Sequence, residues 1–445
     1  MESLKTREKQ GGRKSSQNLN VLIPAAEEFW QVDNAPAQKF SQEYTRNGIT
    51  IGISKNIDEI SVIRPLWDKM QKQQSSNIPD TDYNKYVSVI RSMGAQTEPF
   101  VMYCKKDDRL LAMVIGRTQI KPLDLKLGYL TLFRPRLKCL TIVYGGIVGK
   151  PDDGLCLTLI DELMAQLQDK CADMLQLNFL RTDTTFYRAI RNISNYCPLQ
   201  LKTDKHWRMA VPDTIDKFYS ARSRGHRHNL RKAKSRFEKV YAGDIRYVNY
   251  TTEAEVEDFL KTAAQISKKT YQYALNSGLV NDESTRARIK ADAANGWFRG
   301  HIVFANNKPC AFLLGLKYEN IYYMVNMGYD PSFKSYNPGL ILFLKVLEGL
   351  CYNPTIEFVD FYFGDAEYKN RYGTEFWYES NVCLFAPRMY PMFIKAIQGT
   401  TMYMDAGLKY VINKMGLVDK IKRHWRNLLS TKEVNRKIPI PTQKV

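Results

Sequence analysis

The spacing of hydrophobic and polar residues predicts the same order of elements twice along the chain. Apolar residues recur at helical spacing in some segments, and they alternate or run continuously in others, which is typical of strands. The first half is predicted to form a strand, two helices, a hairpin, a strand, a helix and a strand, at residues 48–54, 57–70, 83–93, 99–105, 109–120, 140–148, 154–174 and 175–180. The second half is predicted to form three helices, a hairpin, a strand, a helix and a strand, at residues 219–241, 253–273, 283–295, 300–306, 310–318, 321–327, from 338, and 356–361. The repeated order predicts two structurally similar α/β (α+β) halves, each with a mixed central sheet flanked by helices.

Residues 329–373 concentrate polar groups on both sides of an apolar helix and a buried strand. The loop before the helix should present free backbone N–H groups at a helix N-terminus, an arrangement that binds phosphate. The candidate phosphate-binding residues are Lys334, Ser335, Tyr336, Asn337, Gly339 and Leu340. The loop after the strand offers two carboxylates, a phenol and an ammonium group, from Asp365, Glu367, Tyr368 and Lys369. The alternative interpretation is an ordinary helix start, with Glu367 and Lys369 in solvent.

The motifs of this segment resemble those of a known family. They are Tyr329-Asp330-Pro331, Tyr336-Asn337-Pro338-Gly339, Asp360-Phe361, Gly364, and Glu367-Tyr368-Lys369 with Arg371 and Tyr372. A further motif, the basic stretch RGHRHNLRKAKSR at residues 224–236, lies upstream of these, in the position where the same family has a basic helix. Together these motifs resemble the BioF2-like (CelD-like) acetyltransferase domain of the GNAT superfamily, which is related to the FemAB aminoacyltransferases. The resemblance covers residues 216–384 and implies two GNAT-like halves side by side.

The resemblance implies an N-acyltransferase that moves an acetyl or other acyl group from acyl-CoA to an amine. The acceptor would be an amino sugar or a related cell-envelope or polysaccharide precursor. The pantetheine arm would lie between strands 321–327 and 356–361, and the pyrophosphate would lie on residues 334–340. Asp365 or Glu367 would accept the amine proton, Lys369 would stabilise the oxyanion, and Tyr368 would protonate the thiolate. Arg227, Arg231 and Tyr329 are the candidate substrate-binding residues.

The corresponding loop of the first half has a different chemistry. Its sequence GGIVGKPDDG carries Asp152 and Asp153 where a phosphate would be repelled. The following strand ends without a Glu-Tyr-Lys triplet. The carrier is therefore expected to bind to the second half, while the first half shapes the acceptor groove or acts only as a buttress.

The chain is strongly basic, with a formal net charge of +19. Such a surface attracts polyanions, including nucleic acid, anionic membranes and phosphate-rich ligands. Basic residues gather in segment 222–239 and in the tail, residues 391–445, whose apolar residues recur at helical spacing. The tail could lie on an anionic membrane surface or dock against the body of the protein. The charge keeps two alternatives open: a FemAB-type transferase that uses aminoacyl-tRNA, and a non-catalytic basic peripheral membrane protein.

Cysteine and histidine spacing give no sign of a metal site. The eight cysteines form no CxxC pair, and the five histidines show no HExxH spacing, so no metal is expected. The chain has no apolar run of about 18 residues, so no transmembrane helix is expected, and its N-terminus does not resemble a secretory signal. The scattered cysteines predict reduced thiols in a cytoplasmic protein, with a peripheral position at the inner face of the membrane as the variant. The predicted organisation is a disordered basic tail (1–40), a GNAT-like domain without its own donor site (41–212), a GNAT-like acyltransferase domain (213–390) and a helical tail (391–445).

Overall fold

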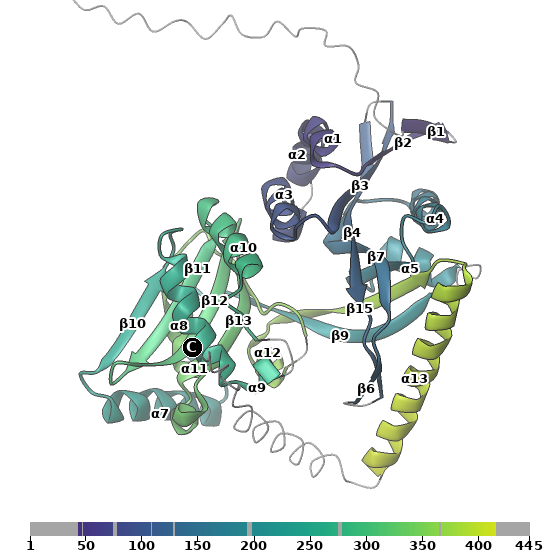
Figure 1. The fold of residues 1–445 in the computed structure, drawn as a ribbon. Helices are drawn as coiled ribbons and strands as arrows, with labels where there is room; N and C mark the ends of the chain where they lie inside the picture. Colours follow the sequence, from purple (N-terminus) through teal and green to yellow (C-terminus); the bar gives the residue numbers. More distant parts are fainter. Residues whose placement is uncertain are drawn as a thin grey trace, which may run out of the picture. The chain divides into compact units, whose positions relative to one another are not determined.

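The computed structural model describes residues 43–414, apart from 47, 74–77, 108, 128–129, 194–197, 275–277 and 365. The predicted N-terminal tail, the candidate Asp365 and the tail beyond residue 414 lie outside the described residues. In the described part, thirteen strands form one sheet, in the order β1-β2-β3-β4-β7-β8-β15-β9-β14-β13-β12-β11-β10 (Figure 1). The first-half strands are β1 (Glu43–Arg46), β2 (Ile49–Ser54), β3 (Thr97–Lys106), β4 (Arg109–Pro122), β7 (Arg136–Gly149), β8 (Met174–Arg181) and β9 (Leu199–Ala210). The second-half strands are β10 (Ile245–Tyr250), β11 (Phe298–Ala305), β12 (Lys308–Tyr318), β13 (Ile321–Tyr329), β14 (Phe358–Asp360) and β15 (Glu375–Phe385). A separate hairpin pairs β5 (Leu125–Leu127) with β6 (Leu130–Phe133).

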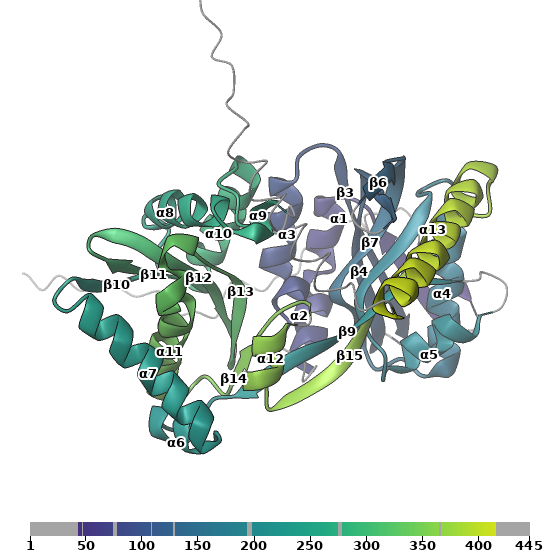
Figure 2. The same cartoon turned by 90° about the horizontal axis from the view of Figure 1, so that it is seen from below.

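Helices cover both faces of the sheet in each half, as the amphipathic patterns require. The first-half helices are α1 (Ile57–Val62), α2 (Arg64–Gln73), η1 (Pro79–Thr81), α3 (Tyr83–Ser92), α4 (Asp153–Gln168) and α5 (Thr185–Asn192). The later helices are α6 (Ile215–Ser220), α7 (Arg224–Val240), α8 (Val256–Lys268), α9 (Tyr271–Ala274), α10 (Glu283–Ala294), η2 (Pro331–Tyr336), α11 (Pro338–Cys351), α12 (Glu367–Tyr372) and α13 (Met389–Lys414). Helices α4 and α5 share one core with the first-half strands, while α1 to α3 form another. In the second half, α7 and α11 lie on one side of β10–β13, and α8 and α10 lie on the other (Figure 2).

The two halves repeat one arrangement and exchange a strand. Each half has antiparallel strands that lead to one parallel pair, β7 with β8 in the first and β13 with β14 in the second. Strand β9 ends the first half in sequence but pairs with β14 of the second. Strand β15 ends the second half but pairs with β8 of the first, and β9 and β15 pair with each other. The predicted two-half α/β fold is confirmed, whereas the domain boundaries at 212/213 and 390/391 stay predictions.

The structure adds strands that the hydrophobic pattern did not predict, namely β1, β5, β6, β9, β10 and β15. It also ends α4 at Gln168, earlier than the predicted residue 174, because the chain turns at Lys170 into β8.

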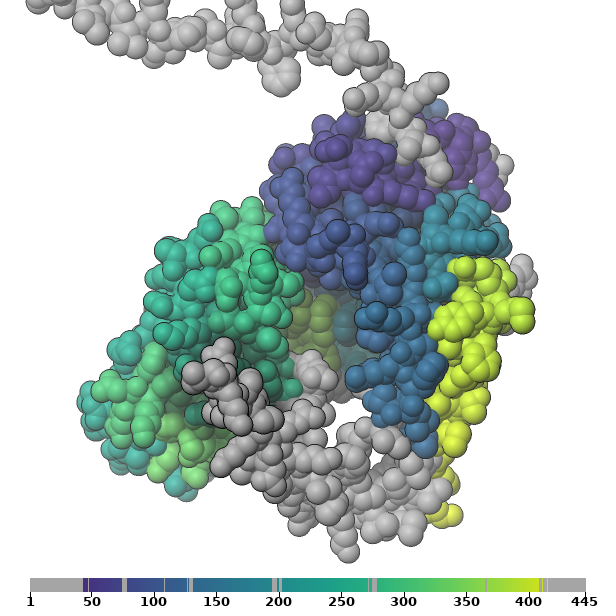
Figure 3. All heavy atoms as spheres, viewed as in Figure 1, coloured from purple at the N-terminus to yellow at the C-terminus, as the bar shows by residue number. Residues whose placement is uncertain are grey.

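Helix α13 begins the predicted C-terminal tail and packs against first-half strands (Figure 3). Its Ile394 is fully buried in a cluster with Leu137, Met174 and Phe385. Large apolar side chains elsewhere on the helix stay exposed, among them Met389, Phe393 and Tyr403. None of the described helices has both the length and the apolar character needed to cross a membrane.

Candidate active site

The parallel pair β13–β14 opens into a fork. Its register runs from Ile321 opposite Phe358 to Tyr323 opposite Asp360, where β14 ends. Strand β13 continues to Tyr329, with an irregularity in its pairing to β12 just beyond the fork. The chain after Asp360 turns away through Tyr362 and Gly364, both of which have positive φ angles. These are the two strands between which the sequence predicted the carrier arm, and Asp360 lies at their point of divergence.

Helix α11 begins beside this fork with an open N-terminus. Its cap residue, Asn337, has a left-handed backbone (φ 50°, ψ 50°) and makes no side-chain cap bond. Pro338 fills the first helical position, where a missing N–H costs nothing. A Cβ added to Gly339 would meet Tyr329 at an ordinary contact distance of 3.6 Å. The first N–H groups of an α-helix have no intrahelical partner, so those of Gly339 and Leu340 suit an anion.

The other predicted phosphate-loop residues precede this helix. Lys334, Ser335 and Asn337 are exposed, and Tyr336 is half-buried against Tyr241. Asp330, at the start of this loop, fixes its position: its carboxylate accepts hydrogen bonds from the Ser332 backbone N–H and from the Lys269 ammonium group.

The equivalent first-half helix, α4, is capped by its own carboxylate. Asp152 Oδ1 accepts a hydrogen bond from the backbone N–H of Leu155 at 2.8 Å. Asp153 adds a second carboxylate in the first turn. Negative charge therefore already occupies the N-terminus of α4, in contrast to that of α11, and the choice of the second half for the carrier stays a prediction.

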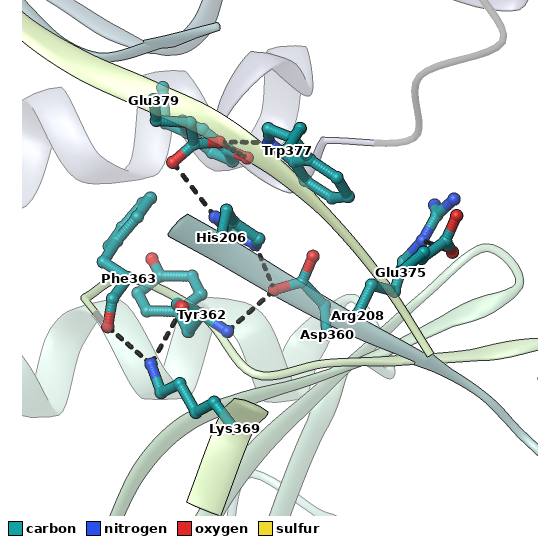
Figure 4. Close-up of polar contacts among 10 residues, drawn as sticks. His206, Arg208, Asp360, Tyr362, Phe363, Lys369, Glu375, Trp377 and Glu379 are labelled. Carbon is teal, nitrogen blue, oxygen red and sulfur yellow. Dashed lines mark hydrogen bonds and ion pairs between the residues drawn. The ribbon is translucent and has the colours of Figure 1, made fainter. Parts of the chain in front are cut away.

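A buried polar cluster joins β9, β14 and β15 behind the fork (Figure 4). His206 Nε2 lies 2.8 Å from Asp360 Oδ1, and His206 Nδ1 lies 3.0 Å from Glu379 Oε2. The three side chains are almost completely buried. Asp360 Oδ1 also accepts the backbone N–H of Tyr362 at 2.7 Å, which ties the carboxylate to the turn after β14.

Aromatic groups fix the position of Glu379 and His206. Glu379 Oε1 accepts hydrogen bonds from the Tyr144 hydroxyl at 2.8 Å and from the Trp377 indole N–H at 2.7 Å. The His206 ring stacks on Trp377, with ring centroids 4.6 Å apart and planes 10° apart, and it also lies parallel to Tyr144. Phe363, from the turn after β14, meets His206 edge-on. The imidazole therefore has little freedom to rotate.

The two carboxylates hold His206 in its charged form. Burial alone would lower the pKa of the imidazole, but hydrogen bonds and charge attraction from Asp360 and Glu379 outweigh it and raise the pKa to about 9. At neutral pH the cluster is an imidazolium between two carboxylates. Such a cation holds one oxygen of Asp360 in place.

The raised pKa of His206 predicts a pH-dependent stability difference. Its pKa in the unfolded chain is about 6.5, so its ion pairing with Asp360 and Glu379 stabilises the fold fully below that pH and is lost as pH rises through about 9. The wild type should have a larger free energy of unfolding than His206→Gln at low pH. This difference should be on the order of 3 kcal/mol larger at about pH 6 than at about pH 9.5. Urea unfolding of both proteins at the two pH values checks this. A stability difference that stays constant with pH would mean that His206 is neutral in the folded protein.

A cleft of about 750 Å³ reaches this cluster. Most of its wall comes from the first-half fork, where the β7–β8 pairing stops at Ile142 opposite Leu177. The second half contributes Tyr323 and Asp360, and the exchanged strands contribute Arg208 and Trp377. Asp360 is therefore both the last paired residue at the second-half fork and part of the wall of a cleft large enough for a substrate.

The structure places the side chains of the predicted catalytic residues Glu367, Tyr368 and Lys369 in three different environments. Glu367 is 85% exposed at its side chain and forms an ion pair with Arg371. Tyr368 is half-buried and meets Phe361 edge-on. Lys369 is buried, and its ammonium group donates hydrogen bonds to the carbonyls of Tyr362 at 3.0 Å and of Phe363 at 2.6 Å. Lys369 thus holds the turn that follows Asp360.

Two of the three predicted substrate-binding residues, Arg227 and Arg231, contact residues 219–222 just before their own helix. Arg227 donates hydrogen bonds to the carbonyls of Ser220 and Arg222. Arg231 lies over the ring of Tyr219, and Tyr329 is 38% exposed at the end of β13. Sequence reasoning missed His206 and Glu379 because it did not predict the strands that carry them. The one available signal was Asp360, which was noted only as part of a motif.

Comparison with known proteins identifies the class of the second half. Residues 224–370 match the family model described as an acetyltransferase (GNAT) domain. The structure of FemX matches with a TM-score of 0.50 at 9% identity, over 75% of this chain and 98% of that one. A tandem GNAT protein from the clavulanic acid biosynthesis pathway matches with a TM-score of 0.46 at 8% identity, over 76% and 99%. A protein of unknown function from Bacteroides thetaiotaomicron matches with a TM-score of 0.44 at 11% identity, over 73% and 97%. No curated protein sequence matches the chain.

Residues 224–370 form an acetyltransferase domain of the GNAT superfamily. About three quarters of this chain has the fold of FemX. Together with the family-model match, this confirms the resemblance to the GNAT superfamily.

Proposed function

We propose that this protein is an N-acyltransferase that transfers an acyl group from acyl-CoA to an amine. The observation that carries the proposal is the position of Asp360, at the fork between β13 and β14 and on the wall of the large cleft. A carboxylate at this point can meet an acyl donor that lies in the fork and an amine that enters from the cleft. The GNAT domain match supports the reaction class.

The donor would lie along the second-half fork, with its pyrophosphate at the N-terminus of α11. The backbone N–H groups of Gly339 and Leu340 would bind the phosphates, and the exposed Lys334 would add positive charge. Ser335, Tyr336 and Asn337 complete this proposed loop. The uncapped α11 and the carboxylate-capped α4 support this choice between the two halves.

The acceptor would bind in the cleft and lose a proton to Asp360. Oδ1 of Asp360 is held by His206 and the Tyr362 N–H, whereas Oδ2 accepts no hydrogen bond from the described part of the chain. Oδ2 would take a proton from the ammonium form of the acceptor, and the neutral amine would attack the thioester carbonyl. As the C–N bond forms and the C–S bond breaks, the attacking nitrogen loses a second proton and the CoA thiolate takes one up, so that amide and thiol are the products and one proton stays on Asp360.

The remaining groups of the second polar loop have proposed supporting roles. Lys369 would position the turn that presents Asp360, through its two carbonyl contacts. Tyr368 would donate the proton to the thiolate, and Asp365 and Glu367 stay as alternative proton acceptors. Many GNAT-type reactions depend more on positioning than on one base, and the rigid cluster behind Asp360 suits that demand.

The cleft favours a polar acceptor with ring-shaped, partly apolar faces. Tyr144, Phe179 and Trp377 supply aromatic surface, Lys150 supplies positive charge, and Arg181 pairs with Asp183, which also lines the cleft. An amino sugar, or a cell-envelope precursor that carries one, combines a ring, hydroxyl groups and an amine. We propose this acceptor class.

A second candidate, aminoacyl-tRNA as donor, is favoured by the location of α7. This strongly basic helix packs beside the proposed phosphate loop, and Arg236 lies 5.3 Å from the ring centroid of Tyr336. The cationic surface therefore continues beyond the space that one pyrophosphate would occupy, which suits a longer polyanion.

Thermal shift assays with CoA, acetyl-CoA and tRNA separate these candidates. A ligand of the native state at about 100 times its Kd stabilises by about 2.7 kcal/mol and raises Tm. The proposal expects a shift with CoA and acetyl-CoA that survives moderate salt. A shift with tRNA alone, which falls steeply with salt, would favour the second candidate. Binding of anionic vesicles with no shift from any donor would favour the non-catalytic alternative.

A further inference from the structure

A second cavity, of about 340 Å³, lies under the C-terminal half of α11. Its floor is the face of strands β10 to β13 that α11 covers, and its walls include Leu342, Val346 and Ile356. It lies toward the opposite end of α11 from the proposed donor loop. Its lining includes none of residues 334–340 of that loop, so the two sites are distinct. The acyl-transfer proposal uses none of its residues.

Two polar atoms in this cavity have no hydrogen-bond partner in the described part of the chain. Tyr322 is 2% exposed, and its buried hydroxyl is unpaired. His301 Nε2 is also buried and unpaired, while His301 Nδ1 lies 2.8 Å from Asn249 Oδ1. The two rings lie near each other, with centroids 6.2 Å apart. Because unpaired buried polar groups destabilise a fold, two of them in one cavity indicate a place for a polar ligand.

The charge of the cavity is predominantly positive. Arg299, Lys317 and Lys345 line it, and the one lining carboxylate, Glu348, pairs with Lys345 at 2.9 Å. Lys317 forms no ion pair within the described residues. A cavity with spare positive charge, apolar walls and unpaired polar atoms suits an amphipathic anion rather than a cation or a neutral apolar molecule.

The hydrogen-bonding pattern narrows the ligand further. With Asn249 Oδ1 as acceptor, the His301 proton is on Nδ1, so Nε2 can only accept. Burial, with the charge of Arg299, lowers the pKa of His301 to about 4, so the ring is neutral at pH 7. The Tyr322 hydroxyl can donate to an anion, whereas His301 Nε2 needs a donor from the ligand.

We propose that this cavity binds a small organic anion that also carries a hydroxyl group. The acidic group would lie near Lys317 and Arg299, the hydroxyl would donate to His301, and the apolar body would lie against Leu342 and Val346. The volume lies near the lower end of the range for small-molecule sites, about 300 to 1,000 Å³, so the ligand is small.

Isothermal titration with 4-hydroxybenzoate, benzoate and inorganic phosphate tests the proposal on the full-length protein. The wild type should bind 4-hydroxybenzoate more tightly than benzoate, which lacks the hydroxyl, and than phosphate, which lacks the apolar body. Lys317→Met should weaken binding at least about tenfold. Lys308→Met changes an exposed lysine on the same strand, outside the cavity, and should leave the Kd unchanged.

Tyr322→Phe supplies a second readout that does not depend on the choice of probe. It removes the unpaired hydroxyl, so the Tm of the ligand-free variant should equal or exceed that of the wild type, while 4-hydroxybenzoate binding weakens. A lower Tm would show that the hydroxyl already has a structural partner and would overturn the proposal. Equal Kd values in Lys317→Met and Lys308→Met, or a wild-type Kd above about 10 mM for all three probes, would also overturn it.

Discussion

Asp360→Asn is expected to lower kcat by about 10²- to 10⁴-fold, with little change in the KM for the acyl donor. The amide keeps the size of the carboxylate and can still accept a hydrogen bond from His206, so the cluster should remain assembled. It cannot take a proton from the acceptor amine, so the loss should fall on the chemical step. Steady-state kinetics with an identified donor and acceptor give both parameters, and Tm values show whether the variant folds.

Two further variants make this test specific. Asp216→Asn removes an exposed carboxylate on α6 and should leave kcat unchanged. Glu367→Gln tests the assignment that the sequence alone suggested, in a residue that is now seen to be 85% exposed. A large kcat loss in Glu367→Gln together with a small one in Asp360→Asn would contradict the role proposed for Asp360.

Gly339→Asp is expected to weaken CoA binding by about 10²-fold or more, because it places a carboxylate at the phosphate end of α11. A like-charge contact at about 4 Å costs about 4 kcal/mol near a protein surface, and the pyrophosphate carries more than one charge. The added Cβ meets only Tyr329 at 3.6 Å, so the fold should tolerate it. Titration calorimetry with CoA measures the loss.

The first half offers a matched control at the same helix position. Gly154 is the second residue of α4, as Gly339 is of α11. Gly154→Asp should leave CoA binding unchanged if only the second half holds the carrier, and Gly339→Ala should show a small effect because it adds no charge. Equal CoA affinity in Gly339→Asp and the wild type would show that the phosphates bind elsewhere.

The sequence predicted the regular elements well where a continuous run of apolar residues marks the element. Helix α11 begins at Pro338 as predicted, and β13 starts at residue 321 in both prediction and structure. The choice of the second half for the carrier stays a prediction, and it rests on local chemistry, since the carboxylates of Asp152 and Asp153 are visible in the sequence. The family resemblance also came from short, local motifs.

The exchanged strands escaped prediction for a physical reason. In β9, every second residue from Lys202 to Arg208 is polar or charged, and His206 is among them. That face carries the buried cluster, so its polarity serves the site and weakens the hydrophobic signal of a central strand. The contacts of His206 with Asp360 and Glu379 span 154 and 173 residues, and they depend on sheet register that no local pattern encodes.

The exchange of β9 and β15 also has a consequence during synthesis on the ribosome. The first-half sheet pairs β8 with β15, which emerges nearly at the end of the described chain. At about 5 to 20 residues per second, the ribosome needs roughly 10 to 40 s to make the residues between them. Through that interval the edge of β8 has no native neighbour, and exposed edges invite pairing with other chains. The nascent first half should therefore be the stage at which this protein most depends on chaperones.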